Sequence, residues 1–415
     1  MRVPFLALRN PIRSYAWGSH TAIPELLGQP SPSVEPQAEL WMGDHPQAPS
    51  DVCVDGGWIS LREWIARDPK AVVGAGGDGS PGDLPFLFKV LAAGQPLSIQ
   101  THPDAAQARA GFAREEALGI PRDAPHRNYR DTNPKPEILY ALTPFHVLRG
   151  FRSTSAILGH FDRAGLADFE PLGALTDGGL DPSVALERFF RRMMDLPQGT
   201  MDGVLERLMA RAATEARDDS RAVDSRYEDP LHWIPRFLEL YPGDRGALGP
   251  LYLELFTLQP GQAIHTGPGV PHAYLDGCGI ELMVSSDNVL RCGLTPKHVD
   301  VPELVSVLRF EPQPPMVLDG STARAGERLY AYPEGGLLLS RLDVTARTPA
   351  VVGDSGGPEI LLCTEGRAIG RSAEESLEVR RGDSFLVPAA SQPSTLEGEA
   401  TLFRARACDP SAPVQ

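Results

Sequence analysis

One stretch, residues 84–104, constrains the fold of this chain more than any other. It begins with the apolar run LPFLFKVLA, turns near Gly94, and continues with a segment that carries Gln100 and His102. An apolar run bounded by turn residues predicts a buried strand with a second strand beside it. Because residues two apart in a strand project from the same face, Gln100 and His102 are expected to point into one cavity. Unligated histidines far outnumber bound ones, so the pair predicts a metal site only if partners lie elsewhere in the chain.

Two later segments offer such partners. Glu137 stands at the head of the apolar run EILY, and His272 follows the turn GPGVP. Zinc accepts two imidazoles and a carboxylate while leaving room for water or substrate. An amide oxygen is a less usual fourth donor, so ligand type alone leaves non-haem iron and manganese open. The sequence therefore predicts one divalent metal, bound by Gln100, His102, Glu137 and His272.

A glycine- and proline-rich turn pattern occurs twice. GPGVPH at residues 267–272 is similar to the Pro-x-Gly-x-x-His half-motif of cupin jelly rolls, with a glycine in place of the first proline. LEVRRGDSFLVPAASQP, at residues 377–393, mirrors the layout that leads up to the first turn. Aligning Gly382 with Gly261 places Pro393 opposite the histidine, and no histidine occurs after residue 311. We therefore expect the C-terminal quarter to form a metal-free jelly roll.

The alternation of these patterns predicts the fold class: mainly β with an α-helical insertion, as two cupin-type jelly-roll β-sandwiches plus a helical domain. Between residues 154 and 239, apolar residues recur at three- and four-residue spacing, which predicts several short helices that pack without chemistry of their own. The expected domains are a catalytic cupin domain made from residues 1–153 and 246–311, an inserted helical domain at 154–245, and the metal-free jelly roll at 312–415.

Smaller helix signals accompany these domains. LREWIAR at residues 61–67 and the alanine-rich segment at 104–118 predict helices, the second beginning at Asp104. Asp181 and Thr200 are expected to cap helices of the insertion.

The overall charge limits the partners. The 415 residues carry a net charge of -15 and have a pI near 5.2, which argues against nucleic acid and anionic membranes as partners. No run approaches the ~20 apolar residues of a membrane span. The five widely spaced cysteines predict reduced thiols in a cytoplasmic protein, which we expect to be a monomer. An anionic substrate then requires a local group of cations.

Such a group follows the second half-motif. SSDNVLRCGLTPKHV, at residues 285–299, brings together Asp287, Arg291, Lys297 and His298. Arginine offers a planar fork of donors to phosphate oxygens and lysine a movable charge. An isolated arginine would be solvated surface, but here a predicted strand leads directly into the segment, which favours pocket residues.

The chain resembles the type I mannose-6-phosphate isomerases (phosphomannose isomerases) in five blocks that span about its first three quarters: YAWGSH, AELWMGDHP, FLFKVLAAGQPLSIQTHPD, KPEILYALTPF and PHAYLDGCGIELMVSSDNVLRCGLTPKHVDV. The resemblance implies that Gln100, His102, Glu137 and His272 are zinc ligands. It also implies interconversion of mannose 6-phosphate and fructose 6-phosphate through a cis-enediol, a reaction that needs a Lewis acid, a proton carrier and anchors for the phosphate.

Candidate roles follow for residues in these blocks. Lys89, Lys135 and Glu281 are the candidates for the proton carrier, and the sequence does not choose among them. The catalytic group is completed by Arg291 and Asp287. The substrate-binding candidates are Trp17, Ser98, Tyr274, Arg291 and Lys297, with core packing an equal alternative for Trp17.

One departure from the family pattern stands out. Relatives usually read Asn-His-Lys-Pro-Glu where this chain has Asn133, Pro134 and then Lys-Pro-Glu, so a histidine often given a part in ring opening or proton transfer is absent. Two other functions stay open on the residues alone. A cupin oxygenase with iron explains the ligands but leaves the cations without a purpose. A sugar-phosphate-binding protein with little or no turnover fits Pro134.

Overall fold

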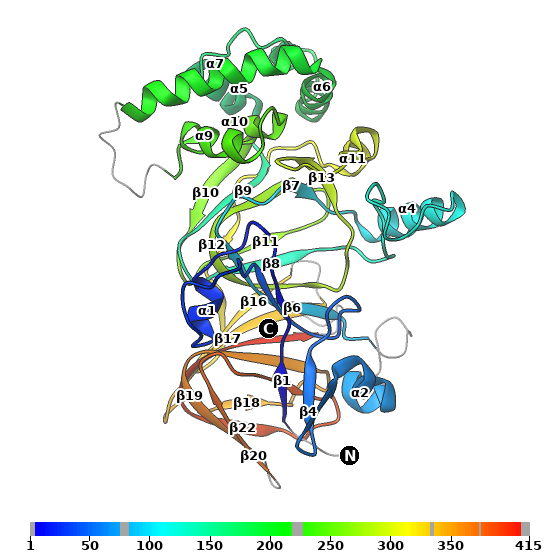
Figure 1. The fold of residues 1–415 in the computed structure, drawn as a ribbon, viewed down its shortest axis with the longest axis vertical. Helices are drawn as coiled ribbons and strands as arrows, with labels where there is room; N and C mark the ends of the chain where they lie inside the picture. The colour runs from blue at the N-terminus through cyan, green and yellow to red at the C-terminus, as the bar shows by residue number, and fades with distance from the viewer. Residues whose placement is uncertain (1–4, 75–82, 218–226, 333–335, 373–374, 408–415) are drawn as a thin grey trace.

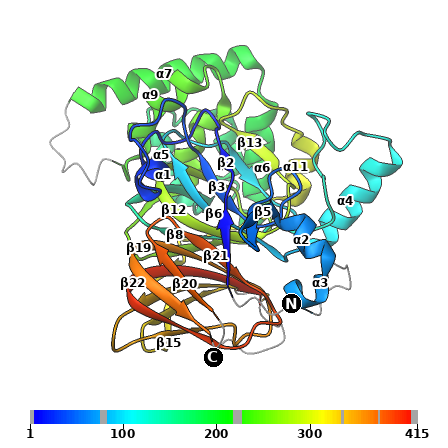
Figure 2. The ribbon, with the colours of Figure 1, turned by 60° about the horizontal axis from the view of Figure 1, so that its bottom comes forward.

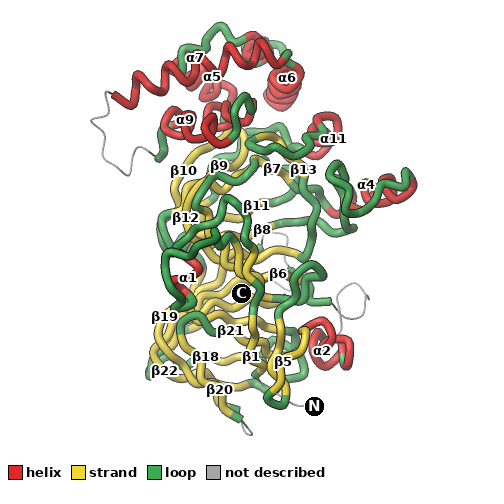
Figure 3. The backbone as a smooth tube through the Cα atoms, viewed as in Figure 1, coloured by secondary structure: helices red, strands yellow, loops and turns green. Residues whose placement is uncertain are grey.

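The computed structural model describes residues 5–74, 83–217, 227–332, 336–372 and 375–407. Two large antiparallel sheets and a group of helices make up this part of the chain (Figure 1). One sheet lies in the middle, a group of helices that includes α5, α6, α7 and α9 covers one of its ends, and the other sheet lies at the opposite end; Figure 3 shows the same division by element type. The predicted fold class, mainly β with a helical insertion, is confirmed. None of the described helices has the length and apolar character needed to cross a membrane.

The middle sheet is ordered β14-β11-β8-β12-β6-β3-β2; in addition, β7 and β9 pair with β12, β13 pairs with β7, and β10 pairs with β9. Its strands are β2 (Ile12–Arg13), β3 (Glu39–Met42), β6 (Phe86–Ala93), β7 (Ile99–Thr101), β8 (Glu137–Ala141), β9 (Phe145–Phe151), β10 (Leu253–Leu258), β11 (Ala263–Thr266), β12 (His272–Val284), β13 (Leu290–Gly293) and β14 (Val317–Leu318). The predicted strand of residues 84–92 is β6, which is buried along its whole length.

Strand β12 joins the two faces of the sandwich. Its first residues pair with β7 and β9, whereas the part from Gly277 onwards pairs with β6 and β8. Gly277 has φ +134°, and a Cβ there would lie 2.8 Å from the ring of Phe145. Only glycine fits this bend, so the chain can carry His272 on one face and Glu281 on the other.

The second sheet contains most of the C-terminal strands, but also three from the N-terminal region. Its strands are β1 (Leu6–Arg9), β4 (Asp51–Val54), β5 (Gly57–Ser60), β15 (Ser321–Arg324), β16 (Glu327–Ala331), β17 (Leu337–Val344), β18 (Ala350–Val352), β19 (Glu359–Arg371), β20 (Ser376–Arg380), β21 (Ser384–Val387) and β22 (Ser394–Ala407). Strand β1 lies between β21 and β4, with Leu6 opposite Leu386 and Leu8 opposite Val52. In Figure 2 the dark-blue N-terminal strand runs beside β21.

Strand pairing therefore crosses the predicted domain limits. β1, β4 and β5 join the sheet of the C-terminal strands, and β14, expected in the C-terminal jelly roll, pairs with β11. The backbone N–H and C=O groups of such short strands form hydrogen bonds with the nearest sheet edge. The sequence of a strand does not specify which edge that is. The division into four residue ranges stays a prediction.

The helices are α1 (Ala22–Leu26), α2 (Leu61–Arg67), α3 (Pro69–Val73), α4 (Ala105–Ala117), α5 (Thr154–Arg163), α6 (Pro182–Asp195), α7 (Gln198–Arg217), α9 (Pro230–Leu240), α10 (Gly249–Tyr252) and α11 (Val301–Val307), with short 3₁₀ turns η1 (Glu170–Ala174) and η2 (Arg245–Leu248). As predicted, Asp104 caps α4 and Asp181 caps α6, each accepting backbone N–H bonds. The cap predicted at Thr200 is wrong, because α7 begins at Gln198, directly after Pro197.

The internal repeat is visible in the backbone. Gly261, between β10 and β11, has φ +99°, and Gly382, between β20 and β21, has φ +92°. Both turns need the left-handed region that glycine adopts without strain. Of the cysteines, Cys53, Cys278, Cys292 and Cys363 are free thiols, and the fifth lies outside the described residues.

Candidate metal centre and substrate cavity

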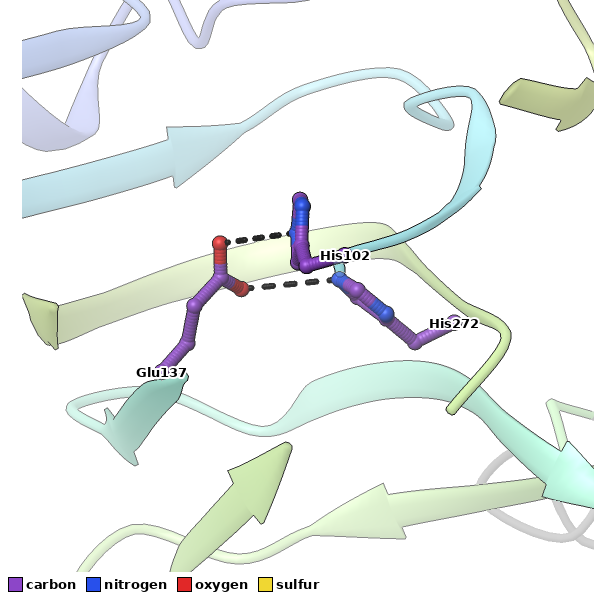
Figure 4. A group of neighbouring side chains, drawn as sticks. All are labelled: His102, Glu137 and His272. Atoms are coloured by element: carbon purple, nitrogen blue, oxygen red, sulfur yellow. Dashed lines mark ion pairs between the residues drawn. The ribbon is translucent and has the colours of Figure 1, made fainter. Parts of the chain in front are cut away.

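Three strands of the middle sheet bring three metal-ligand side chains together. His102 directly follows β7, Glu137 begins β8 and His272 begins β12. The turn before His272 is held against the first histidine, because the N–H of Gly269 donates to the carbonyl oxygen of His102 at 2.9 Å. Figure 4 shows the two imidazoles facing the carboxylate of Glu137.

The geometry of this triad fits a metal ion. The Nε2 atom of His102 lies 3.3 Å from Oε1 of Glu137, and that of His272 lies 3.5 Å from Oε2. Ligand atoms of all three residues lie within 4.8 Å of one another, and the side chains are at most 1% exposed. Both Nε2 atoms are buried without a hydrogen-bond partner. Buried polar atoms normally have partners, so two such atoms aimed at one carboxylate indicate a cation between them.

Outer hydrogen bonds set the direction of both rings. His102 Nδ1 lies 2.8 Å from the carbonyl oxygen of Asn288, and His272 Nδ1 lies 3.0 Å from that of Val270. Carbonyl oxygens accept hydrogen bonds, so each Nδ1 carries the proton and each Nε2 keeps its lone pair for a metal. The hydroxyl of Tyr274 donates to Oε2 of Glu137 at 3.2 Å, and its predicted contact with substrate stays a prediction.

Electrostatics keep the ligands in their metal-binding forms. Burial, followed by the charge of Lys135, lowers the pKa of His102 to about 4. Burial alone would raise the pKa of Glu137, but Lys135, 2.7 Å away, and His102 together hold it well below its usual range. Neutral imidazole and ionised carboxylate are the forms that bind metal.

Gln100, the predicted fourth ligand, is the neighbour of His272 across β7 and β12, and of Arg291 across β7 and β13. Cross-strand neighbours carry their side chains on the same face of a sheet. The register thus places Gln100 between the triad and Arg291, and its role as a ligand stays a prediction.

A cavity of about 190 Å³ adjoins the triad through Lys135, which lines it and also contacts Glu137. Its lining includes five of the predicted site residues: Lys89, Lys135, Asp287, Arg291 and Lys297. The cavity is also lined by Tyr15, Trp41, Gln47, Leu87, Arg127, Arg130, Met283, Ser286 and Val289.

Lys89 is locked into a buried ion-pair group. Its ammonium lies 2.9 Å from Glu281, its direct cross-strand neighbour, and 3.4 Å from Glu39. Burial alone would lower the pKa of Lys89, but Glu281 and Glu39 outweigh it and raise that pKa above its ordinary value. Burial raises the pKa of Glu281, against the opposing charge of Lys89.

Asp287 is held by two residues of one N-terminal segment, His45 and Gln47. Its Oδ2 accepts a hydrogen bond from Gln47 at 2.8 Å and lies 3.5 Å from Nε2 of the buried His45. Burial alone would raise the pKa of Asp287, but the His45 contact and the charge of Lys135 lower it. Asp287 therefore lines the cavity as an ionised carboxylate at neutral pH.

Three cations of the cavity, Arg130, Arg291 and Lys297, have no ion pair within the described residues. Burial and then Arg130 lower the pKa of Arg291, and burial, Arg291 and Arg130 lower that of Lys297. Mutually repelling cations without carboxylate partners are suited to an anion. Arg130 was not predicted from the sequence, although its position seven residues before the ligand Glu137 was a usable signal.

Three predicted substrate-binding residues, Trp17, Ser98 and Tyr274, lie outside the cavity lining. Trp17 stacks on Tyr15, which does line the cavity, and packs against a core cluster with Phe145 and Tyr274. Ser98 is half-buried just before β7. Their contact with substrate stays a prediction.

Comparison with known proteins agrees with this site. A family model described as the catalytic domain of type I phosphomannose isomerase matches residues 5–154. The mannose-6-phosphate isomerase of Escherichia coli is 38% identical over 406 residues, covering 96% of this chain and 98% of that protein. The human mannose-6-phosphate isomerase is 33% identical over 321 residues, 72% of each chain.

Solved structures agree as well. A mannose 6-phosphate isomerase from Salmonella typhimurium, described as bound to substrate (f6p) and a zinc atom, superimposes with a TM-score of 0.86 and 35% identity, covering 98% of this chain and 100% of that one. A holo, zinc-bound mannose 6-phosphate isomerase gives the same TM-score and identity. With the triad, the cationic cavity and these similarities along nearly its whole length, the chain belongs to the type I phosphomannose isomerases, the mannose-6-phosphate isomerase family.

Proposed function

We propose that the chain is a zinc-dependent aldose–ketose isomerase that interconverts mannose 6-phosphate and fructose 6-phosphate through a cis-enediol. The observation that carries this proposal is the buried His102, Glu137 and His272 triad beside a cavity whose lining includes three cations without an ion pair among the described residues. Family membership supports it, since the E. coli and human relatives are mannose-6-phosphate isomerases and the Salmonella structure holds f6p and zinc.

The residues present fit zinc. His102, Glu137 and His272 would hold it, with Gln100 as the proposed fourth ligand. When bound, zinc supplies a Lewis acid that polarises a sugar oxygen. The neutral imidazole of His102 and the ionised carboxylate of Glu137 described above are what such a site requires.

The cations are proposed to hold the phosphate. Arg291 offers two parallel N–H donors from the β13 side of the cavity, and Lys297 lies exposed at its mouth. Binding energy at the phosphate fixes the reacting carbons against the catalytic groups. Ser98 is proposed as a further contact.

Among the three proton-carrier candidates, Lys135 has the strongest structural support. Lys89 stays protonated between two carboxylates, so it donates hydrogen bonds and does not accept a proton. Glu281 is 2% exposed and does not line the cavity, whereas Lys135 does. Asp287 lines the cavity as a carboxylate and is proposed to accept from a sugar hydroxyl.

The test is an assay of mannose 6-phosphate conversion before and after removal of metal by a chelator, with zinc added back. We expect activity that is lost with the chelator and restored by zinc. Oxygen consumption without isomerisation would instead support the oxygenase. Binding of mannose 6-phosphate without conversion would support the sugar-phosphate-binding protein.

We also propose that the enzyme is a cytoplasmic monomer without nucleic-acid or membrane partners. Its net charge of -15 and its free described cysteines support this. Light scattering at micromolar concentration tests the oligomeric state, and a dimer mass would overturn it.

A further inference from the structure

Asn288 lies directly behind the site and is completely buried. It follows Asp287, a cavity residue, and precedes β13, which carries Arg291. Its backbone carbonyl oxygen accepts the hydrogen bond from Nδ1 of His102 at 2.8 Å. The main chain at Asn288 therefore fixes the ring orientation of one metal ligand.

The side chain of Asn288 holds a different segment. Its Oδ1 accepts hydrogen bonds from the backbone N–H groups of Arg130 at 2.7 Å and Asp131 at 3.2 Å. Its Nδ2 donates to the carbonyl oxygens of Asp131 and Asn133, both at 2.9 Å. One amide thus satisfies four backbone groups of a loop that has no helix or sheet to satisfy them.

Neighbouring side chains complete the connection. Asp131 accepts from the N–H of Asp287 at 2.7 Å and from the hydroxyl of Ser286 at 2.9 Å. The same hydroxyl accepts from the N–H of Asn288 at 3.2 Å. The loop at residues 130–133 and the segment at residues 286–288 therefore each donate hydrogen bonds to the other and accept them from it.

The loop held in this way carries functional groups at both ends. Arg130 lines the cavity at its beginning, and Lys135 and Glu137 follow its end. The guanidinium of Arg130 has no ion pair in the described part of the chain, although its charge reaches Arg291 and Lys297.

We infer that Asn288 is a positioning residue that couples the metal centre to the anion-binding cations, and that Arg130, which it places, is a third cation for the phosphate. The inference rests on the proposed function for the identity of the anion. Asn288 touches neither metal nor substrate; it acts through His102 on one side and the loop at residues 130–133 on the other.

A purely structural role for Asn288 predicts a different result. Loss of a buried amide would then lower the stability of the chain and leave the metal and substrate affinities of the folded protein unchanged. Coupling predicts that both affinities weaken together. Outer hydrogen-bond partners of metal ligands typically contribute about 10–100-fold to metal affinity or activity.

The experiment compares Asn288→Ala with Asn128→Ala. Asn128 belongs to the same segment, but its side chain donates outward to Asp300 at 2.9 Å, so its variant is a matched control. The zinc dissociation constant is measured by competition with a chelator, and KM and kcat by turnover of mannose 6-phosphate. We expect Asn288→Ala to weaken zinc at least tenfold and to raise KM, while Asn128→Ala changes neither by more than twofold. The carbonyl that holds His102 is present in both variants, so a change in zinc affinity reports a displaced main chain.

Arg130→Ala separates the two parts of the inference. It should raise KM at least tenfold and leave the zinc dissociation constant within twofold. If Asn288→Ala matches the control in both zinc affinity and KM, coupling is overturned, even if its unfolding temperature falls. If Asn288→Ala does not fold, Ser286→Ala, which removes only the bridging hydroxyl, should weaken zinc severalfold, and an unchanged affinity would overturn coupling.

The zinc measurement does not depend on turnover. A chain that binds zinc but does not convert mannose 6-phosphate would refute the proposed function, and the effect of Asn288→Ala on zinc affinity would still decide the coupling.

Discussion

At the scale of single residues, His272 offers a direct test of the metal site. Its Nε2 is buried, lacks a hydrogen-bond partner and faces Glu137. Removing one of three donors in His272→Ala should reduce zinc, measured by metal analysis after gel filtration, far below one ion per chain. His146→Ala is the control, because His146 is also buried but bonds to Thr257. Full zinc stoichiometry in His272→Ala would refute the site.

The pKa of His102 predicts a pH dependence. Burial and the charge of Lys135 lower that pKa from 6.5 to about 4, so between these values the folded protein binds fewer protons than the unfolded chain. Stability from the neutral imidazole is present above pH 6.5 and is lost as the pH falls towards 4. In metal-free protein, the unfolding free energy should fall as the pH falls across this range, and His102 should contribute up to about 1.4 kcal/mol per pH unit to that slope. The variant His102→Gln should therefore show a shallower slope. Urea unfolding at several pH values measures this, and equal slopes would contradict it.

Arg291 tests the phosphate site. Removing one partner of a desolvated charge pair typically costs ~2–5 kcal/mol, so Arg291→Ala should lower kcat/KM for mannose 6-phosphate at least tenfold. Arg309→Ala, on the exposed Arg309 that pairs with Glu311 at 3.1 Å, is the control. A kcat/KM within twofold of the unmodified enzyme would place the phosphate elsewhere.

These residues also show what sequence alone can predict of a site. His102, Glu137 and His272 were predicted because ligand chemistry and strand context agree at each of them. Arg130 and Asn288 were not, because their roles arise from a loop whose shape is set by contacts more than 150 residues away in sequence.

At the scale of elements, the loop around Pro134 is the departure most open to test. Proline has no side-chain proton and no backbone donor, and it biases Asn133 towards an extended conformation. General acid–base help is worth roughly 10²–10⁴-fold, so we expect Pro134→His to raise turnover at unchanged zinc content. The assay uses both anomers of mannose 6-phosphate. Pro134→Ala is the control, because it removes the ring without adding an imidazole.

Two outcomes would contradict that expectation. If Pro134→His is inactive or misfolded while Pro134→Ala is also impaired, the stiffness of the proline is what the loop requires. If both variants match the parent enzyme, another group already supplies the proton transfer.

Helix starts show why element prediction succeeds unevenly. Asp104 and Asp181 were predicted as caps because a carboxylate before a helical pattern satisfies free N–H groups. Thr200 has the same chemistry, but Pro197 already fixes the backbone where α7 begins. Local chemistry thus identifies a possible cap, and the neighbouring residues decide whether it is used.

At the scale of the whole molecule, the two sheets share one of the apolar clusters of the described residues. Leu6 and Val52 from the N-terminal strands pack in the same cluster as Phe88 of the middle sheet and as Ile360 and Phe403 of the C-terminal strands. The sequence predicted the strands but not this sharing, since apolar patterns do not reveal which sheet a strand joins.

A cluster shared by both sheets predicts cooperative unfolding. A chain ending at residue 311 should fail to fold, because β1 then lacks its partner strand β21 and the shared cluster lacks the side chains of the C-terminal strands. The full chain should lose both sheets in one thermal transition, followed by circular dichroism and calorimetry. A soluble, zinc-binding truncated chain, or two separate transitions, would show that the sheets fold independently.

The position of β1 also bears on how the protein is made. Leu6 leaves the ribosome long before its partner Leu386, which follows it by 386 − 6 = 380 residues. At about 5–20 residues per second, the apolar N-terminal strand waits roughly 20–80 s for its neighbour. During that time the nascent chain exposes an unpaired, aggregation-prone edge, so its yield in the cell should depend on chaperones that shield β1 until β21 emerges.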